Sequence, residues 1–171
     1  MDKNIVLIGF MGSGKTTYGK AIARVLGMEF IDSDEFIEET EGMDIISIFR
    51  QKGEEYFREL EKTAVESLSK RKGLVIATGG GTIKKEENMK ALKSSGSIVY
   101  IEASAEKIME NLDGDISRPI LDGGDKLEKI TELLKERCPL YEKYKDITFT
   151  VGRGNIENNV KKLTKLLEVL V

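Results

Sequence analysis

The chain has 171 residues, a formal net charge of −3 and 33% charged residues. This length suits one domain with a single well-formed core, and an acidic balance without a basic tract excludes a dedicated nucleic-acid-binding protein. One cysteine, Cys138, excludes an internal disulfide, and no apolar run reaches membrane-spanning length. The apolar run 5–8 is too short for the hydrophobic part of a signal peptide, so we expect a cytoplasmic protein. We also expect a monomer that binds neither nucleic acid nor membrane.

The first motif predicts binding of a nucleoside triphosphate. Residues 5–8 are apolar and rich in β-branched side chains, as in a buried parallel strand, and residues 9–16 fit the P-loop pattern G-x-x-x-x-G-K-[ST]. Apolar residues at helical spacing follow up to Leu26, and Gly27 supplies a stop. A glycine-rich turn that binds nothing is the alternative, which the flanking strand and helix disfavour. The residues expected to hold ATP are Gly12, Ser13, Gly14, Lys15, Thr16 and Thr17. Lys15 reaches the β/γ-phosphates and Thr16 is a ligand for Mg²⁺.

Four further apolar runs predict strands, at residues 29–32, 74–77, 97–101 and 147–151. Helical spacing predicts helices over residues 35–72, 86–93, 105–112, 126–144 and 156–170. Gly53 should interrupt the first of these helices, and Pro139 should bend or break the fourth. Residues 113–125 are rich in glycine and aspartate, and we expect them to form a lid.

This alternation of strands and helices predicts one α/β domain over residues 1–171. Five short apolar strands that alternate with helices form a parallel sheet covered on both faces, which gives three layers. Ligands of such sheets bind at the carboxyl ends of the strands. The motifs that follow the strands should therefore meet in one cleft.

The third strand ends in Gly79, Gly80 and Gly81, where a self-contained ATPase carries a Walker B aspartate. A guanine-reading N-K-x-D is also absent from the sequence, which disfavours a GTPase switch. Residues without side chains leave backbone N–H groups open to a second substrate, although a glycine tract can also serve turn geometry alone. The carboxylate near the metal must then come from elsewhere, and Asp32 is the best candidate.

Asp34 lies two residues after Asp32 and shares its face if the strand continues. A small-molecule kinase needs one carboxylate near the metal and another that orients the acceptor hydroxyl and accepts its proton. The alternative for either aspartate is an N-cap of the following helix.

Three arginines stand in special contexts. Arg58 follows Phe57 with Glu61 one turn later to orient it, Arg137 precedes Cys138-Pro139, and Arg118 is at the centre of the expected lid. A single arginine on a helix is usually a solvated surface residue. Together, however, they indicate an anionic acceptor that bears a carboxylate, because a guanidinium binds a carboxylate in bidentate fashion.

Taken together, these motifs resemble those of shikimate kinases. The resemblance rests on residues 9–16, Asp32-Ser-Asp34, the run 44–61 with Gly53-Glu-Glu-Tyr-Phe-Arg58, Thr78-Gly-Gly-Gly81, Arg118-Pro-Ile-Leu121 and Glu136-Arg137-Cys-Pro-Leu-Tyr141. These motifs occur in the family's order across nearly the whole chain.

The resemblance implies a P-loop kinase fold like that of nucleoside monophosphate kinases, with strand order 2-3-1-4-5, a substrate-binding subdomain over residues 34–60 and the lid over 113–125. It implies transfer of the γ-phosphoryl group of ATP, with Mg²⁺, to the 3-hydroxyl of shikimate on the route to chorismate. Another small-metabolite kinase, such as a gluconate or nucleotide kinase, and a non-catalytic nucleotide-binding module are the alternatives.

The resemblance also implies roles for individual residues. Asp34 would hold the acceptor hydroxyls and act as base, with Arg58 and Arg137 clamping the carboxylate and Gly79, Gly80 and Gly81 contacting the ring. Lys15 and Arg118 would serve catalysis at the phosphates, Arg118 descending with the lid. Thr16 and Asp32 would serve Mg²⁺.

Two positions depart from the family's pattern. Many members carry a second lid arginine near the adenine, seven residues before the Arg-Pro pair, where this chain has Asn111. Arg153, in the loop after the fifth strand, is a candidate to stack on the base in its place. An exposed loop arginine without such a role is the alternative.

Overall fold

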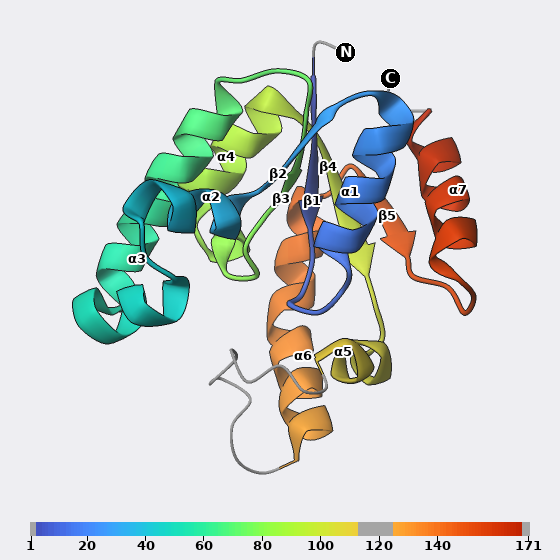
Figure 1. Cartoon of the computed structure of the whole chain (residues 1–171). Helices are drawn as coiled ribbons and strands as arrows, with labels where there is room; N and C mark the ends of the chain where they lie inside the picture. Colours follow the sequence, from blue (N-terminus) through green and yellow to red (C-terminus); the bar gives the residue numbers. More distant parts are fainter. Residues whose placement is uncertain (1–2, 113–124, 169–171) are drawn as a thin grey trace.

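The computed structural model describes residues 3–112 and 125–168 and contains one five-stranded sheet (Figure 1). The strands are β1 (Asn4–Ile8), β2 (Glu29–Asp32), β3 (Leu74–Ala77), β4 (Gly96–Glu102) and β5 (Ile147–Thr150). All neighbouring pairs are parallel, and the order is β2-β3-β1-β4-β5. The predicted fold class and strand order are therefore confirmed.

The helices are α1 (Lys15–Leu26), α2 (Ser33–Glu41), α3 (Ile45–Ser69), α4 (Glu86–Ser95), α5 (Ala105–Leu112), α6 (Lys126–Tyr144) and α7 (Ile156–Leu167), with a 3₁₀ turn η1 (Thr82–Lys84). The helix predicted over residues 35–72 is two helices, α2 and α3, and Gly53 interrupts α3 with a φ of 86°. Pro139 does not break α6, which continues from Lys126 to Tyr144. In the described part of the chain, no helix has both the length and the apolar character that crossing a bilayer requires.

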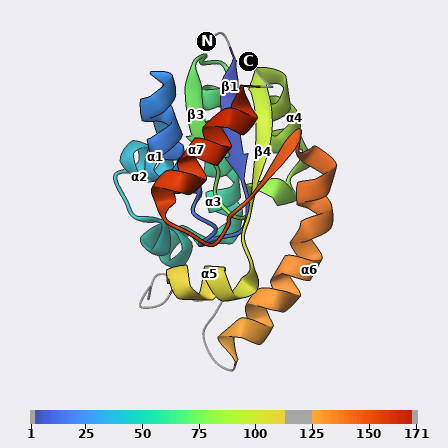
Figure 2. The ribbon, with the colours of Figure 1, turned by 90° about the vertical axis from the view of Figure 1, so that its right-hand side faces the viewer.

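Alternating side chains of β1 supply both halves of the core. Ile5 and Leu7 pack with the buried residues of α1 and α7 on one face of the sheet. Val6 and Ile8 pack on the other face, with residues from α3, α4 and α6. Figure 2 shows α1 and α7 together on their side of the sheet. Because both faces are covered, the polar groups of the site can gather only at the ends of the strands.

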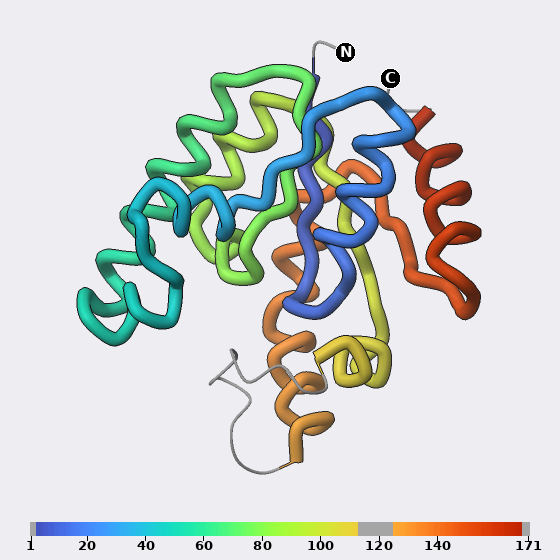
Figure 3. Tube along the Cα trace, viewed as in Figure 1, coloured from blue at the N-terminus to red at the C-terminus, as the bar shows by residue number. Residues whose placement is uncertain are grey.

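Helices α2 and α3 form a lobe with a small core of its own. Ile37, Ile48, Phe57 and Ala64 are buried against one another, and no residue of the sheet belongs to this cluster. The tube in Figure 3 shows the pair extending away from the sheet. Asp44 starts α3 by accepting the Ser47 N–H at 2.8 Å. The lobe thus holds the middle of α3 beside the carboxyl ends of the strands.

We expect the lobe's core to be sensitive to a cavity. Ile48 is fully buried, so Ile48→Ala removes packed methyl groups and should lower the free energy of unfolding by about 2–5 kcal/mol. Urea denaturation measures the change. Ile46→Ala, at a position that is 39% exposed on the same helix, is the control and should change stability by less than about 1 kcal/mol. Equal losses in the two variants would contradict the packing described here.

Candidate active site

Residues 9–16, the phosphate loop, connect β1 to α1 as predicted. Gly14 caps the N-terminus of α1 in the left-handed region at φ 99°, a conformation that side chains disfavour. The Lys15 ammonium donates to the carbonyl oxygens of Gly9 at 2.8 Å and Phe10 at 2.9 Å, and the residue is 8% exposed. The N-terminal N–H groups of α1 and this ammonium give the loop a positive potential suited to phosphates.

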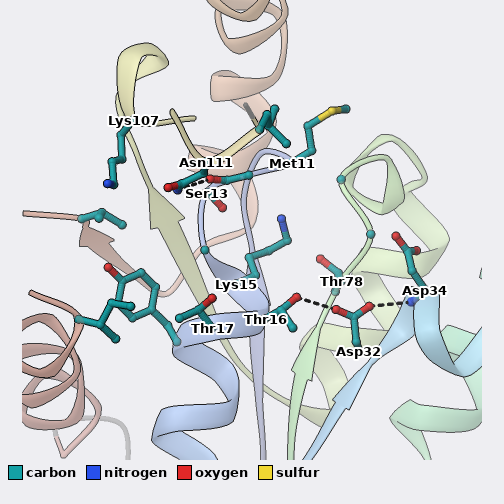
Figure 4. A pocket seen from close by; sticks show the side chains of 18 residues that line it. Met11, Ser13, Lys15, Thr16, Thr17, Asp32, Asp34, Thr78, Lys107 and Asn111 are labelled. Carbon is teal, nitrogen blue, oxygen red and sulfur yellow. Dashed lines mark hydrogen bonds between the residues drawn. The ribbon is translucent and has the colours of Figure 1, made fainter. Parts of the chain in front are cut away.

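A pocket of about 430 Å³ opens over the phosphate loop. All the residues predicted to hold ATP on this loop, Gly12 to Thr17, line it. Asp32, Asp34, Gly79 and Gly80 line its wall on the β2–β3 side. Lys107, Asn111, Val151 and Ile156 line the part formed by α5 and the β5–α7 connection. Figure 4 shows the two groups on opposite sides of Lys15.

Thr16 and Asp32 are joined at the base of the pocket. The Thr16 hydroxyl donates to Oδ2 of Asp32 at 2.7 Å (Figure 4). A hydroxyl beside a carboxylate is an oxygen donor set of the type that Mg²⁺ accepts together with phosphate oxygens and water. Among the described residues no group of three acidic, cysteine or histidine side chains could hold a metal unaided. The fit is therefore to a Mg²⁺ ion that arrives with a polyphosphate.

Asp34 reaches the pocket by a route different from the one predicted. The strand does not continue past Asp32, so the two side chains do not share a strand face; α2 begins at Ser33. Asp32 is the N-cap of α2 because its Oδ1 accepts the Asp34 N–H at 3.0 Å. Asp34 is therefore not the capping residue. Its side chain, in the first turn of α2, faces Gly79.

Each residue of the glycine triplet, Gly79 to Gly81, faces one of the predicted acceptor-binding side chains. A methyl group on Gly79 would lie 2.5 Å from Oδ1 of Asp34, and one on Gly81 would lie 2.6 Å from Nη1 of Arg58. Between them, the carbonyl of Gly80 accepts a hydrogen bond from Nη1 of Arg137 at 3.1 Å. The structure therefore brings together Asp34, Arg58 and Arg137, which come from three different helices.

The triplet was predicted to leave its backbone N–H groups open to a second substrate, but one of these groups is already bonded within the protein. The Gly79 N–H donates to the Ser33 hydroxyl at 3.0 Å. This bond ties the start of α2 to the end of β3 and so fixes Asp34 beside the triplet. Gly79 therefore allows the Asp34 side chain to approach closely, whereas its N–H group is not available to a substrate because it binds Ser33.

Arg58 is held by a buried carboxylate. Glu61 is 1% exposed; its Oε2 accepts from Nη1 of Arg58 at 3.0 Å, and its Oε1 accepts from the Thr82 hydroxyl at 2.8 Å. Glu54 adds a longer contact to Nη2 of Arg58 at 3.3 Å. The predicted orienting role of Glu61 is thus confirmed, and its second partner, Thr82 of η1, was not foreseen because η1 has no signal in the sequence.

Arg137 is a buried cation without an ion-pair partner among the described residues. It is 3% exposed, its guanidinium carbon lies 5.1 Å from the centre of the Phe10 ring, and its Nε atom has no hydrogen-bond partner in this part of the chain. Burial raises the pKa of the neighbouring Tyr141 to about 12, although the Arg137 guanidinium opposes this shift. The phenol therefore stays neutral and does not balance the charge, which favours an anionic ligand at Arg137.

Two predicted residues stand apart from this cluster. Arg118 lies outside the described residues. Arg153 is exposed in the β5–α7 connection and does not belong to the lining of the pocket. Sequence reasoning missed Lys107, which lines the pocket one helical turn before Asn111; their i, i+4 spacing on α5 was the available signal. Asn111 itself donates to the Gly12 carbonyl at 2.8 Å.

Comparison with known proteins gives a consistent result. The model of the shikimate kinase family ("SKI: Shikimate kinase") matches residues 11–168. A shikimate kinase of Thermodesulfovibrio yellowstonii is 49% identical over 82% of this chain and 82% of its own length. One from Caldanaerobacter subterraneus subsp. tengcongensis is 44% identical over 95% of each. The solved structure of shikimate kinase from Acinetobacter baumannii in complex with shikimate is 38% identical, with a TM-score of 0.92 over 99% of this chain and 94% of that one.

The phosphate loop can be tested by nucleotide binding alone. Lys15→Met removes the ammonium that faces the pocket, so ATP affinity should fall by at least about tenfold, the loss of one charge-assisted contact. Titration calorimetry measures the affinity, and circular dichroism checks that the fold is intact. Lys20→Met, an exposed lysine on the same helix, is the control. Unchanged ATP binding in the Lys15 variant would contradict the role given to this loop.

Proposed function

The chain belongs to the shikimate kinase family, and on this premise we propose that it transfers the γ-phosphoryl group of ATP to the 3-hydroxyl of shikimate. The observation that carries the proposal is the meeting of Asp34, Arg58 and Arg137 around the glycine triplet, next to the phosphate loop. One carboxylate and two guanidinium groups complement an acceptor that presents hydroxyls at one end and a carboxylate at the other.

The acceptor side would work by fixing orientation. Arg137 has an unpartnered Nε and no counter-ion among the described residues, so a carboxylate would complete its contacts. Arg58, aligned by Glu61, would supply the second half of the clamp. Asp34 would then accept a hydrogen bond from the reacting hydroxyl and take its proton as the new P–O bond forms. Gly79, Gly80 and Gly81 would leave room for the ring between these groups.

The phosphate side would stabilise charge. The N–H groups of the phosphate loop and the Lys15 ammonium would hold the β- and γ-phosphates in line with the acceptor oxygen. Thr16 and Asp32 would hold Mg²⁺, which supplies charge neutralisation at the phosphates when bound. Arg118 would add a further positive charge from the segment 113–125, which we propose as a lid that excludes water.

The remaining features stay proposals. Residues 34–60 would form the acceptor-binding subdomain, which the separate core of α2 and α3 supports. Arg153 would contact the adenine only if its side chain turned toward the pocket. A cytoplasmic location is consistent with the single cysteine. A monomeric state is also proposed.

The test of the function is a coupled assay of ADP release with and without shikimate, using gluconate and nucleoside monophosphates as alternative acceptors. We expect ADP release that requires both ATP and shikimate, and loss of that release when Mg²⁺ is removed with a chelator. Equal release with gluconate, or tight ATP binding with no acceptor-dependent release, would overturn the proposal.

Arg58→Lys should weaken the acceptor selectively. Lysine retains the charge but loses the planar pair of donors, so the KM for shikimate should rise by roughly tenfold to a hundredfold while the KM for ATP changes less than about twofold. Steady-state kinetics with each substrate varied gives both constants. Arg50→Lys, an exposed arginine on the same helix, should leave both unchanged. A parallel rise of both KM values would argue against the clamp.

Asp34→Asn should act on the chemical step. An amide cannot accept the hydroxyl proton, so kcat should fall by roughly 10²–10⁴. Glu35→Gln, at the exposed neighbouring position in α2, is the matched control and should keep the wild-type rate. Near-normal turnover by Asp34→Asn would reduce Asp34 to a residue that merely lies beside the triplet.

A further inference from the structure

We propose that Asn159 is a positioning residue for the nucleoside of ATP, because it joins α1 to the β5–α7 connection beneath the end of the pocket farthest from Asp34. This inference rests on the proposed function and extends it to a residue that makes no contact with the pocket itself. Neither its sequence position nor the pocket lining points to Asn159.

Asn159 uses both hydrogens of its amide to connect two separate elements. Its Nδ2 donates to the hydroxyl oxygen of Tyr18 in α1 at 3.2 Å and to the carbonyl oxygen of Gly152 at 3.2 Å. A carbonyl oxygen can only accept, so the nitrogen of the amide must be the end that faces Gly152. The residue is 3% exposed, and both bonds are therefore shielded from competition with water.

A polar residue is unexpected at this position. Val160, Leu163 and Leu167 of α7 pack on α1 and the sheet, and Asn159, one turn before Leu163, lies in the same contact. A buried amide costs free energy unless its donors are satisfied, and an aliphatic side chain would fill the space without this cost. The amide therefore specifies how α7 and its preceding connection sit against α1.

The two partners of Asn159 lead directly to the pocket. Tyr18 lines the pocket, and its ring lies so close beneath the phosphate loop that a methyl group on Gly14 would be 2.9 Å from Cε2. Gly152 follows Val151, and both Val151 and Ile156 line the pocket. Ile156 is 54% exposed, so its apolar side chain is accessible from the pocket that it lines.

The order of the pocket assigns this wall to the nucleoside. The phosphate loop occupies the middle of the pocket, and Asp34, Gly79 and Gly80 line the acceptor side. The wall formed by Val151 and Ile156 faces Lys107 and Asn111 and is the part left for the sugar and base. Asn159 holds that wall at a fixed distance from the phosphate loop, so it should govern how well the nucleoside fits and leave the phosphate contacts unaffected.

The experiment compares two ligands that share phosphates and differ in the nucleoside. Asn159→Leu keeps the approximate volume and removes both donors. The Kd of ATP should rise about tenfold, the loss expected for the weakening of one to two hydrogen bonds, while the Kd of inorganic tripolyphosphate changes less than about twofold. Calorimetric titration gives both constants without any acceptor. With saturating ATP, the kcat and the KM for shikimate should stay within about twofold of wild type.

Two further variants separate positioning from mere stability. Leu163→Val makes a small cavity in the same α1–α7 contact and should lower Tm with no change in the Kd of ATP. Tyr18→Phe removes only one of the two arms and should raise the Kd of ATP by about two- to fivefold, which preserves the test if Asn159→Leu does not fold.

Three results would overturn the proposal: an unchanged Kd of ATP in a folded Asn159→Leu variant, equal weakening of ATP and tripolyphosphate, or a Leu163→Val effect on ATP as large as that of Asn159→Leu. These outcomes are independent of the acceptor. A wild-type chain that binds ATP but releases no ADP with shikimate would overturn the proposed function. The Kd values of ATP and tripolyphosphate would still test the role of Asn159.

Discussion

The active site depends on a backbone segment that carries no side chains, held at the carboxyl end of β3. Asp34 and Arg58 approach Gly79 and Gly81 more closely than any Cβ atom would permit, and Arg137 binds the carbonyl between them. The parallel sheet makes this possible because it brings the ends of β2 and β3 side by side, with Asp32 opposite Ala77. Opposite charges can therefore converge on one short segment from three different helices.

The second constraint is the charge balance of this cluster. Two guanidinium groups near one another repel, and the part of the chain that the structure describes pairs only that of Arg58 with a carboxylate, the buried Glu61. Arg137 has no carboxylate partner among the described residues, and burial keeps the neighbouring Tyr141 neutral. The uncompensated positive charge is thus located at the Arg137 guanidinium. In the proposed function this charge would favour an acceptor that bears a carboxylate over a neutral polyol such as a sugar.

Prediction from the sequence succeeded where the signal is local. The phosphate loop, the five strands and Gly53 each carry a pattern of short range, and the structure confirms them. The shared face of Asp32 and Asp34 depended on the strand continuing, and it does not continue. Asp32 instead caps α2, which is the alternative that the sequence left open for either aspartate. The bonds of Glu61 to Thr82 and of Asn159 to Tyr18 join elements brought together only by folding, so no spacing in the sequence could reveal them.

Asn111, on the α5 side of the pocket, supports the phosphate loop by a hydrogen bond and carries no charge. At position 111 the resemblance implies an arginine in many family members, whereas the Asn111 amide of this chain donates to the Gly12 carbonyl and attaches α5 to the phosphate loop. The loop is then supported from two sides, by Asn111 on α5 and by the Tyr18 ring under Gly14. An arginine at position 111 could provide charge, but the short amide provides a fixed distance between α5 and the loop. The cation on this wall is Lys107, which lies one turn away on the same face of α5. Charge and anchoring, which a single arginine would combine, are thus divided between two residues of one helix.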